Sequence, residues 1–287
     1  MPLDPDQLDK PARKLRKLLK KIPADPSPDQ IHAFRTNARK FEAIALANDE
    51  NGENKELKHL AKLRKRAGKV RDMDVLTAYT AELNADGSEK ECSVRLLEHL
   101  GTQRHKQADK FRKTAKQYSP KVRAALKRTS KQLEKGLDKP NSRAATDKAS
   151  DVTSSAVKLV SELSRPVRFN QVTLHAYRKK IKELRNLLRT AKDPSNEEFV
   201  EKLGSVKDAI GEWHDWEELL AIATDLLKHP QCRLVRQLKE KAETQFQNAL
   251  ALTERFRKHY LRASRGGRKQ PGRPTQPVWS ATAALAA

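Results

Sequence analysis

One stretch of this sequence occurs twice, 143 residues apart, and the two copies align without gaps. His32 and Arg35 return as His175 and Arg178. The apolar pattern around them is also repeated: Ile31, Phe34, Ala38 and Phe41 correspond to Leu174, Tyr177, Ile181 and Leu184. Apolar residues at spacings of three and four predict an amphipathic helix with one buried face. The chain is therefore expected to contain two related helical halves.

A glycine and an aspartate follow each histidine at the same distance in both copies. Gly68 and Asp72 in the first copy correspond to Gly211 and Asp215 in the second. We predict that each glycine ends a helix and that each aspartate caps the next one, or else holds a neighbouring basic side chain in position. These four residues are interpreted as structural. The two aspartates are not assigned to ligand binding, because a carboxylate would repel an anionic partner of the kind that the charge balance, described next, indicates.

The charge balance indicates the kind of partner. The chain of 287 residues has 60 Lys and Arg against 37 Asp and Glu, a formal net charge of +23. This excess favours association with phosphate polymers, nucleic acid or anionic surfaces. Few residues are aromatic, and no sustained alternation of apolar and polar residues predicts a strand, so we expect an all-α fold.

Turn and cap residues divide the chain. Ser27 and Pro28 predict a helix start, and Ser119 and Pro120 predict another. We expect a first half at about 1–136, a linker at about 137–153 and a second half at about 154–262. Residues 263–287 are rich in Gly, Pro, Ser, Thr and Arg and contain no acid, which is typical of a disordered basic tail.

Neither a secretory signal nor a membrane-spanning run is apparent, so a cytoplasmic protein without a membrane partner is expected. Cys92 and Cys232 stand alone in the sequence, and we expect reduced thiols and no structural zinc.

The candidate site is a basic stripe beside the apolar face of each repeated helix. Guanidinium groups grip phosphate oxygens in pairs, lysine supplies a point charge, and imidazole donates a hydrogen bond. A row of such groups about one helical turn apart suits a polymer of phosphates. The stripes comprise His32, Arg35, Arg39 and Lys40 in the first copy, and His175, Arg178, Lys179, Lys182, Arg185 and Arg189 in the second.

A second basic row follows the first copy at helical spacing and consists of Lys58, Lys62, Lys65 and Lys69. Three of the four matching positions in the second copy are acidic, with Glu201, Asp208 and Glu212 beside Ser205. The lysine row is either part of the site or a solvated helix face.

These motifs resemble the CHAD domain, a helical family named for its conserved histidines. The resemblance rests on His32-Ala33-Phe34-Arg35, on the run from Gly68 to Leu76, and on Leu174-His175-Ala176-Tyr177-Arg178-Lys179, and it covers about residues 27–262. Glu42 and His214 stand where the family usually has arginines. The resemblance implies two pseudo-symmetric, antiparallel helical-bundle halves around a basic central cavity. It also implies non-catalytic binding of inorganic polyphosphate, at polyphosphate granules. Since the sequence has no metal-ligand or cofactor motif, we expect no cofactor and no metal.

Two other functions compete with this interpretation. DNA binding is the main alternative, and residues 265–274 resemble the Gly-Arg-Pro core of an AT-hook, which would let the protein bridge polyphosphate and DNA; a merely solubilising tail is the other possibility. Catalysis is disfavoured, because no nucleophile, phosphate-cradling glycine loop or His-Glu-x-x-His metal motif is present. The sequence leaves the oligomeric state open.

Overall fold

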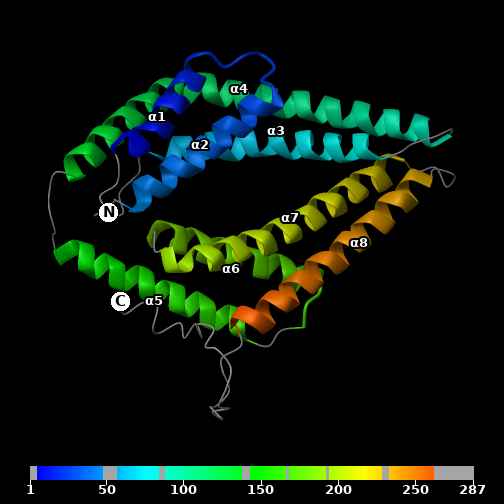
Figure 1. Cartoon of the computed structure of the whole chain (residues 1–287). Helices are drawn as coiled ribbons and strands as arrows, with labels where there is room; N and C mark the ends of the chain where they lie inside the picture. The colour runs from blue at the N-terminus through cyan, green and yellow to red at the C-terminus, as the bar shows by residue number, and fades with distance from the viewer. Residues whose placement is uncertain are drawn as a thin grey trace, which may run out of the picture. The chain divides into compact units, whose positions relative to one another are not determined.

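The chain forms helices throughout the part that the structure describes. The computed structural model describes residues 5–47, 57–83, 88–137, 143–165, 168–191, 194–227 and 233–261. Every element in these ranges is helical (Figure 1), so the prediction of an all-α fold is confirmed. The predicted tail at 263–287, with its AT-hook-like segment 265–274, lies outside the described residues.

The helices follow one another with short connections. A 3-10 turn precedes α7, and one stretch of π-helix continues α8. In chain order the elements are α1 (Pro5–Lys20), α2 (Pro28–Ala47), α3 (Lys58–Glu82), α4 (Ser88–Leu137), α5 (Arg143–Ser164), α6 (Gln171–Ala191), η2 (Pro194–Asn196), α7 (Glu197–Leu226), α8 (Arg233–Phe256) and η3 (Arg257–Leu261).

The helices divide into two compact units. Unit 1 comprises residues 1–142 and 218–238, and unit 2 comprises residues 143–217 and 239–287. Helices α7 and α8 therefore each contribute to both units. Helix α5 begins at Arg143, within the range 137–153 that the sequence predicts as a linker.

The core of unit 1 is built by α1, α2, α3 and α4. Phe34 of α2 meets Phe111 of α4 edge to face, with ring centres 5.4 Å apart. The prediction that a helix starts at Ser119 and Pro120 is wrong, since α4 runs through Pro120 without ending. An internal proline removes one backbone hydrogen bond. Burial of Val122 and Leu126 in the core offsets that loss.

The core of unit 2 contains the apolar face of the second repeat. Leu174, Tyr177, Ile181 and Leu184 of α6 are all buried, as are Ile31, Phe34, Ala38 and Phe41 of α2 in unit 1. On α7, Ile210 and Trp213 belong to the same cluster. The apolar pattern therefore predicted the buried faces of both helices correctly.

Both repeated helices begin with a reciprocal capping arrangement. The Gln30 amide donates to Ser27 Oγ at 3.3 Å, and the Ser27 amide donates to Gln30 Oε1 at 3.0 Å. In the second copy the Thr173 amide donates to Asn170 Oδ1 at 2.9 Å, and the Asn170 amide donates to Thr173 Oγ1 at 2.8 Å. Each pair satisfies two amides that lack helical partners. The cap at Ser27 is confirmed, and the cap at Asn170 lies in the same register.

The two glycine–aspartate segments lie inside helices. α3 continues through Gly68 and Asp72, and α7 continues through Gly211 and Asp215. The prediction that the glycines end helices and that the aspartates cap new ones is therefore wrong. At Gly211 a close contact with an arginine of α6, described below, accounts for a glycine within the helix.

Asp74 and Arg104 connect α3, α4 and the segment before α2. Arg104 Nε donates to Asp74 Oδ1 at 2.7 Å, while its Nη atoms donate to Asp25 Oδ1 at 2.5 Å and to the Pro26 carbonyl at 2.6 Å. The Asp74 side chain is only 2% exposed. Burial alone would lower the pKa of Arg104, but the bonds to the two carboxylates outweigh it and raise that pKa.

Cys92 on α4 is disulfide-bonded, and none of the described cysteines is free. The expectation of reduced thiols is therefore wrong for Cys92, while Cys232 lies outside the described residues. Within the described ranges, no helix has the length and apolar character needed to cross a bilayer.

Candidate polyanion-binding site

In unit 1, Arg35 lies across α3 at Gly68. A Cβ atom on Gly68 would be 4.0 Å from Arg35 Nη2, and Arg35 Nη1 lies 3.9 Å from Asp72 Oδ1. The guanidinium is half-buried, and burial, together with the nearby Arg39, lowers its pKa. An arginine still remains protonated under these conditions. Asp72 was predicted either to cap a helix or to hold a basic side chain in position. Its contact with Arg35 fits the second role.

Arg35 lies within a cluster of arginines. Besides Arg39, its pKa is lowered by the charges of Arg71 and Arg64, both on α3. Neither of these two residues was predicted from the sequence to belong to the site. Their signal was present, because residues seven apart on a helix share a face, and Gly68 lies between them on that face.

Glu42 interrupts the stripe on α2. Its Oε2 accepts a hydrogen bond from Arg64 Nε at 2.5 Å, whereas its Oε1 is buried without a hydrogen-bond partner. Burial raises the pKa of Glu42, and the charge of Arg64 partly opposes this shift. One of the cluster's arginines is thus partly neutralised from within the protein.

His32, Arg39 and Lys40 are exposed on α2. The Nε2 atom of His32 lies 3.4 Å from Thr36 Oγ1. Lys40 directly follows Arg39, so its side chain points about 100° further round the helix. Lys40 therefore diverges from the stripe formed by the other basic residues.

The lysine row of α3 consists of exposed side chains at Lys58, Lys62, Lys65 and Lys69. Lys62 Nζ donates to the Tyr118 hydroxyl of α4 at 3.2 Å and lies 4.8 Å from the centre of that ring. His59 stacks on the same ring at 4.4 Å. Lys62 is thus held against α4.

In unit 2, two arginines of α6 pack over two glycines of α7. Arg178 Nε donates to the Lys207 carbonyl at 3.3 Å, and a Cβ atom on Gly211 would lie 2.6 Å from Arg178 Nη2. Arg185 Nε donates to the Val200 carbonyl at 3.2 Å, and a Cβ atom on Gly204 would lie 3.1 Å from that Nε.

These two contacts are copies of one another. In each, the accepting carbonyl lies four residues before the glycine, and the copies are seven residues apart on both helices. The missing Cβ of each glycine lets a guanidinium approach the helix backbone closely. We refer to Arg178 over Gly211 and Arg185 over Gly204 as the arginine seats.

The remaining basic residues predicted for α6, which are Lys179, Lys182 and Arg189, are exposed. Arg189 lies close enough to Arg185 to lower its pKa, after the larger effect of burial. Asp208 of α7 acts in the opposite direction on the same pKa. Lys180 lies outside the stripe, and its Nζ pairs with Glu162 of α5 at 2.7 Å.

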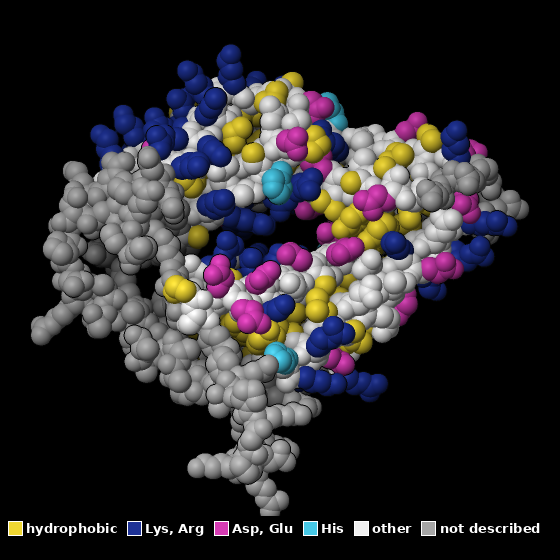
Figure 2. Space-filling view, viewed as in Figure 1, with side chains coloured by type: hydrophobic (Ala, Val, Ile, Leu, Met, Phe, Trp, Pro, Cys, Tyr) yellow, Lys and Arg dark blue, Asp and Glu magenta, His cyan; other side chains and the backbone are white. Residues whose placement is uncertain are grey.

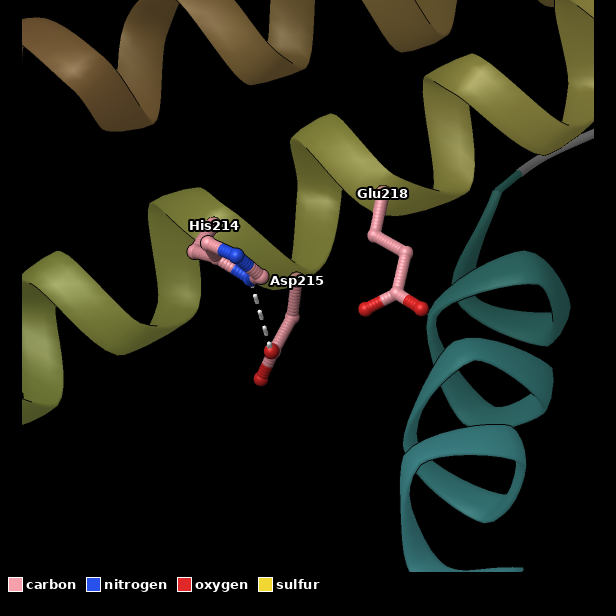
Figure 3. A group of neighbouring side chains, drawn as sticks. All are labelled: His214, Asp215 and Glu218. Atoms are coloured by element: carbon pink, nitrogen blue, oxygen red, sulfur yellow. Dashed lines mark ion pairs between the residues drawn. The ribbon is translucent and has the colours of Figure 1, made fainter. Parts of the chain in front are cut away.

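His175 lies against His214, a histidine outside the predicted site. Its ring centre is 5.3 Å from that of His214 on α7, with the planes inclined by 31°. Burial lowers the pKa of His175, as do the neighbouring charges of His214, Lys179 and Arg178. His214 Nδ1 is also 3.9 Å from Asp215 Oδ1 (Figure 3). Asp215 thus contacts a histidine, where Asp72 contacts an arginine.

A further basic surface lies outside the predicted stripes. Figure 2 shows Lys and Arg side chains crowded over the end of unit 1 where α1 and the last turns of α4 lie. The exposed residues there include Arg13, Lys14, Lys17, Lys127 and Lys131. These five cations lie on helix faces that belong to neither predicted stripe.

If the arginine seats bind phosphate groups, Gly211→Ala should weaken that binding about threefold to tenfold, because the new Cβ displaces the guanidinium of Arg178 while its charge remains. Titration with a labelled polyphosphate measures this change. Gly101→Ala is the matched control, since a Cβ on Gly101 of α4 meets nothing within 4 Å. It should raise the free energy of unfolding by up to about 1 kcal/mol and leave binding unchanged. If the Gly211→Ala variant and the wild type bind equally well, Gly211 does not position Arg178 for binding.

Comparison with known proteins identifies the family. The CHAD domain profile matches residues 15–224, which is well over half of the chain, and the protein therefore belongs to the CHAD domain family. The match includes α2, α3, α6 and most of α7, and it ends before α8. No curated protein and no solved structure matches the chain.

Proposed function

We propose that this protein binds inorganic polyphosphate, without changing it chemically, through the basic stripes of α2 and α6. Membership of the CHAD family supports this proposal, because the family is associated with polyphosphate binding. The basic central cavity implied by the resemblance, and a location at polyphosphate granules, remain parts of the proposal.

The arginine seats are the observation that carries the proposal. A guanidinium offers five N–H donors, and the backbone carbonyl takes only the Nε–H of Arg178 and of Arg185. The Nη groups retain donors for phosphate oxygens, which guanidinium groups bind in pairs. Because the backbone fixes part of each side chain, less conformational entropy is lost when a phosphate binds.

Acidic side chains on α7 restrict which anions can approach the basic stripe of α6. Acidic residues on α7 occupy positions that carry lysines on α3, and Asp208 forms an ion pair with Lys207. The second copy therefore presents cations from α6 beside acids from α7. We expect this mixed surface to favour a narrow, flexible anion that can follow the arginines and avoid the carboxylates.

Binding should weaken steeply as salt increases. If about eight phosphates are neutralised, the single-strand coefficient gives a slope of roughly −6 in a plot of log affinity against log salt concentration. Fluorescence anisotropy of labelled long-chain polyphosphate at several salt concentrations measures this slope. A slope near zero would rule out an ion-exchange mechanism.

A competition experiment distinguishes polyphosphate from DNA. Polyphosphate and duplex DNA are compared at equal phosphate concentration and physiological salt, with the full chain and with a variant ending at Leu261. We expect polyphosphate to displace DNA from both proteins. If the shortened protein binds DNA as strongly as polyphosphate, the site is a general polyanion surface.

Acidification should strengthen polyphosphate binding. Protonation of an imidazole adds positive charge, so affinity rises as the pH falls through the histidine pKa values. Burial and neighbouring charges hold the pKa of His175 below its ordinary value of 6.5 in the free protein, so the rise in affinity that it contributes should be complete only at a pH below that value. Affinity measured between about pH 8 and about pH 5 tests this, and His175→Gln should flatten the profile. An unchanged profile in that variant would exclude His175 from the site.

A further inference from the structure

The basic surface on α1 and the last turns of α4, which we name the outer basic surface, has a definite cause in the core of unit 1. Leu15 and Leu19 of α1 are buried in that core, as are Val122 and Leu126 of α4, and the two helices pack against each other. The opposite face of each helix is therefore turned to solvent. The surface consists of five exposed cations on these faces, which are Arg13, Lys14, Lys17, Lys127 and Lys131.

The outer basic surface lies among charges of almost one sign. From Lys10 to Lys20, every exposed side chain of α1 is a lysine or an arginine, and α4 has no acidic residue from Lys110 to Leu133. The carboxylate of Asp9 lies 3.0 Å from Arg13 Nε and offsets part of that one charge. A solvated protein surface ordinarily mixes both signs, because like charges repel one another. An anionic partner would relieve this repulsion.

The residue types on the outer basic surface favour a phosphate backbone over a lipid surface. In the described part of the chain, the large apolar side chains that are exposed are Val94, Val157 and Val172, and none of them lies on this surface. Helices that bind membranes insert such residues, or aromatic ones, into the lipid interface. Binding to the backbone of a nucleic acid needs only cations, because it is driven by the release of counterions.

The same residue types favour a double strand over a single strand. The segments 9–20 and 120–132 contain no aromatic residue, whereas single strands are held largely by bases stacked on aromatic rings. The axes of packed helices lie about 8–10 Å apart, and the grooves of B-DNA are about 6 Å and about 12 Å wide. The cations of α1 and those of α4 can therefore contact phosphates on both strands of a duplex.

We propose that the outer basic surface binds the phosphate backbone of double-stranded nucleic acid without reading its sequence. This inference goes beyond polyphosphate binding, since it assigns a different ligand to helix faces outside the stripes of α2 and α6. It is also independent of the AT-hook-like segment at 265–274. Polyphosphate is itself a polymer of charged phosphates and competes for the same cations, so it should still displace DNA from the protein.

Anisotropy titration of a labelled DNA duplex of about 20 base pairs, roughly two helical turns, with the full chain tests the surface. Five neutralised phosphates give a slope of about −4.5 in a plot of log affinity against log salt concentration. Lys14→Glu with Lys17→Glu, and Lys127→Glu with Lys131→Glu, should each lower the affinity at least about tenfold. Each pair should also bring the slope to about −2.7, because two phosphate contacts are lost. Circular dichroism establishes that the variants keep their helical content.

Lys106→Glu with Lys110→Glu is the matched control. It makes the same change in charge at the same spacing as the α4 variant, at exposed positions about 25 Å or more from Lys127 along the helix. We expect it to lose less than about threefold in affinity for the duplex. Arg178→Glu with Lys182→Glu should also bind the duplex within about threefold of the wild type. A failure of the proposed polyphosphate site is thereby distinguished from a failure of the outer basic surface.

The alternative ligands are tested alongside the duplex. Vesicles of phosphatidylcholine and phosphatidylserine are titrated at the same concentration of anionic charge, and we expect them to bind more weakly than DNA. The proposal is overturned if either surface variant binds the duplex like the wild type, as it would if residues 265–274 were responsible. It is equally overturned if the control loses as much affinity as the surface variants, or if the vesicles bind more tightly than the duplex.

Discussion

Replacing Arg178 and Lys182 together with glutamate should lower the affinity for long-chain polyphosphate by about 100-fold at physiological salt. Charge-assisted hydrogen bonds contribute about 1.5 kcal/mol or more each, and about 1.4 kcal/mol corresponds to a factor of ten. The new carboxylates also repel the ligand. The two residues lie four apart on α6, so both changes fall on one face of the helix. Anisotropy titration with labelled polyphosphate measures the loss.

The control must change the net charge by the same amount at the same spacing. Lys106→Glu with Lys110→Glu meets this condition, because both lysines are exposed on α4, outside the stripes. We expect this variant to lose less than about threefold in affinity, through the general field of the protein. Similar losses in both variants would show that net charge controls binding and that the stripe has no special role.

Arg104→Met should destabilise the fold by about 3–5 kcal/mol. The change leaves the Asp74 carboxylate buried without its charged partner, which is the costly way to break a buried ion pair. It also removes the hydrogen bonds that reach Asp25 and Pro26. Urea unfolding followed by circular dichroism measures the loss.

A second change restores stability if the unpaired charge is the cause. Asp74→Leu combined with Arg104→Met removes both charges and should recover at least about half of the loss. The surface pair of Arg13 and Asp9, with Arg13 56% exposed, provides the comparison. Arg13→Met should cost less than about 1 kcal/mol. If Arg104→Met costs no more than Arg13→Met, the interaction between Asp74 and Arg104 does not stabilise the fold.

The sequence predicted those features of the fold that depend on residues close together in the chain. Apolar spacing identified the buried faces of α2 and α6, and Ser27 identified a helix start, because periodicity and capping depend on neighbouring residues. Gly68, Gly211 and Pro120 were misread as breaks. Gly211 lies inside a long helix because the guanidinium of Arg178 needs room there, and Pro120 lies inside one because the core needs Val122 and Leu126.

The site shows the same division. The stripe on α6 followed from helical spacing, and the structure places Arg178 and Arg185 as one repeated arrangement. Gly204 could not be recognised from the sequence, since it has no glycine counterpart in the first copy, where Ala61 stands. The place of Arg64 in the site depends on which helices become neighbours, and so does the ring contact between His214 and His175. The sequence of one helix does not determine which other helix will pack against it.

The distribution of α7 and α8 between the units bears on how the molecule can be divided. Each helix crosses from one unit to the other within continuous helical backbone: α7 between Glu217 and Glu218, α8 between Leu238 and Lys239. A cut near residue 142 would therefore strip one fragment of the helix ends that complete it. Neither unit therefore corresponds to one continuous stretch of the sequence that a single pair of cuts could excise.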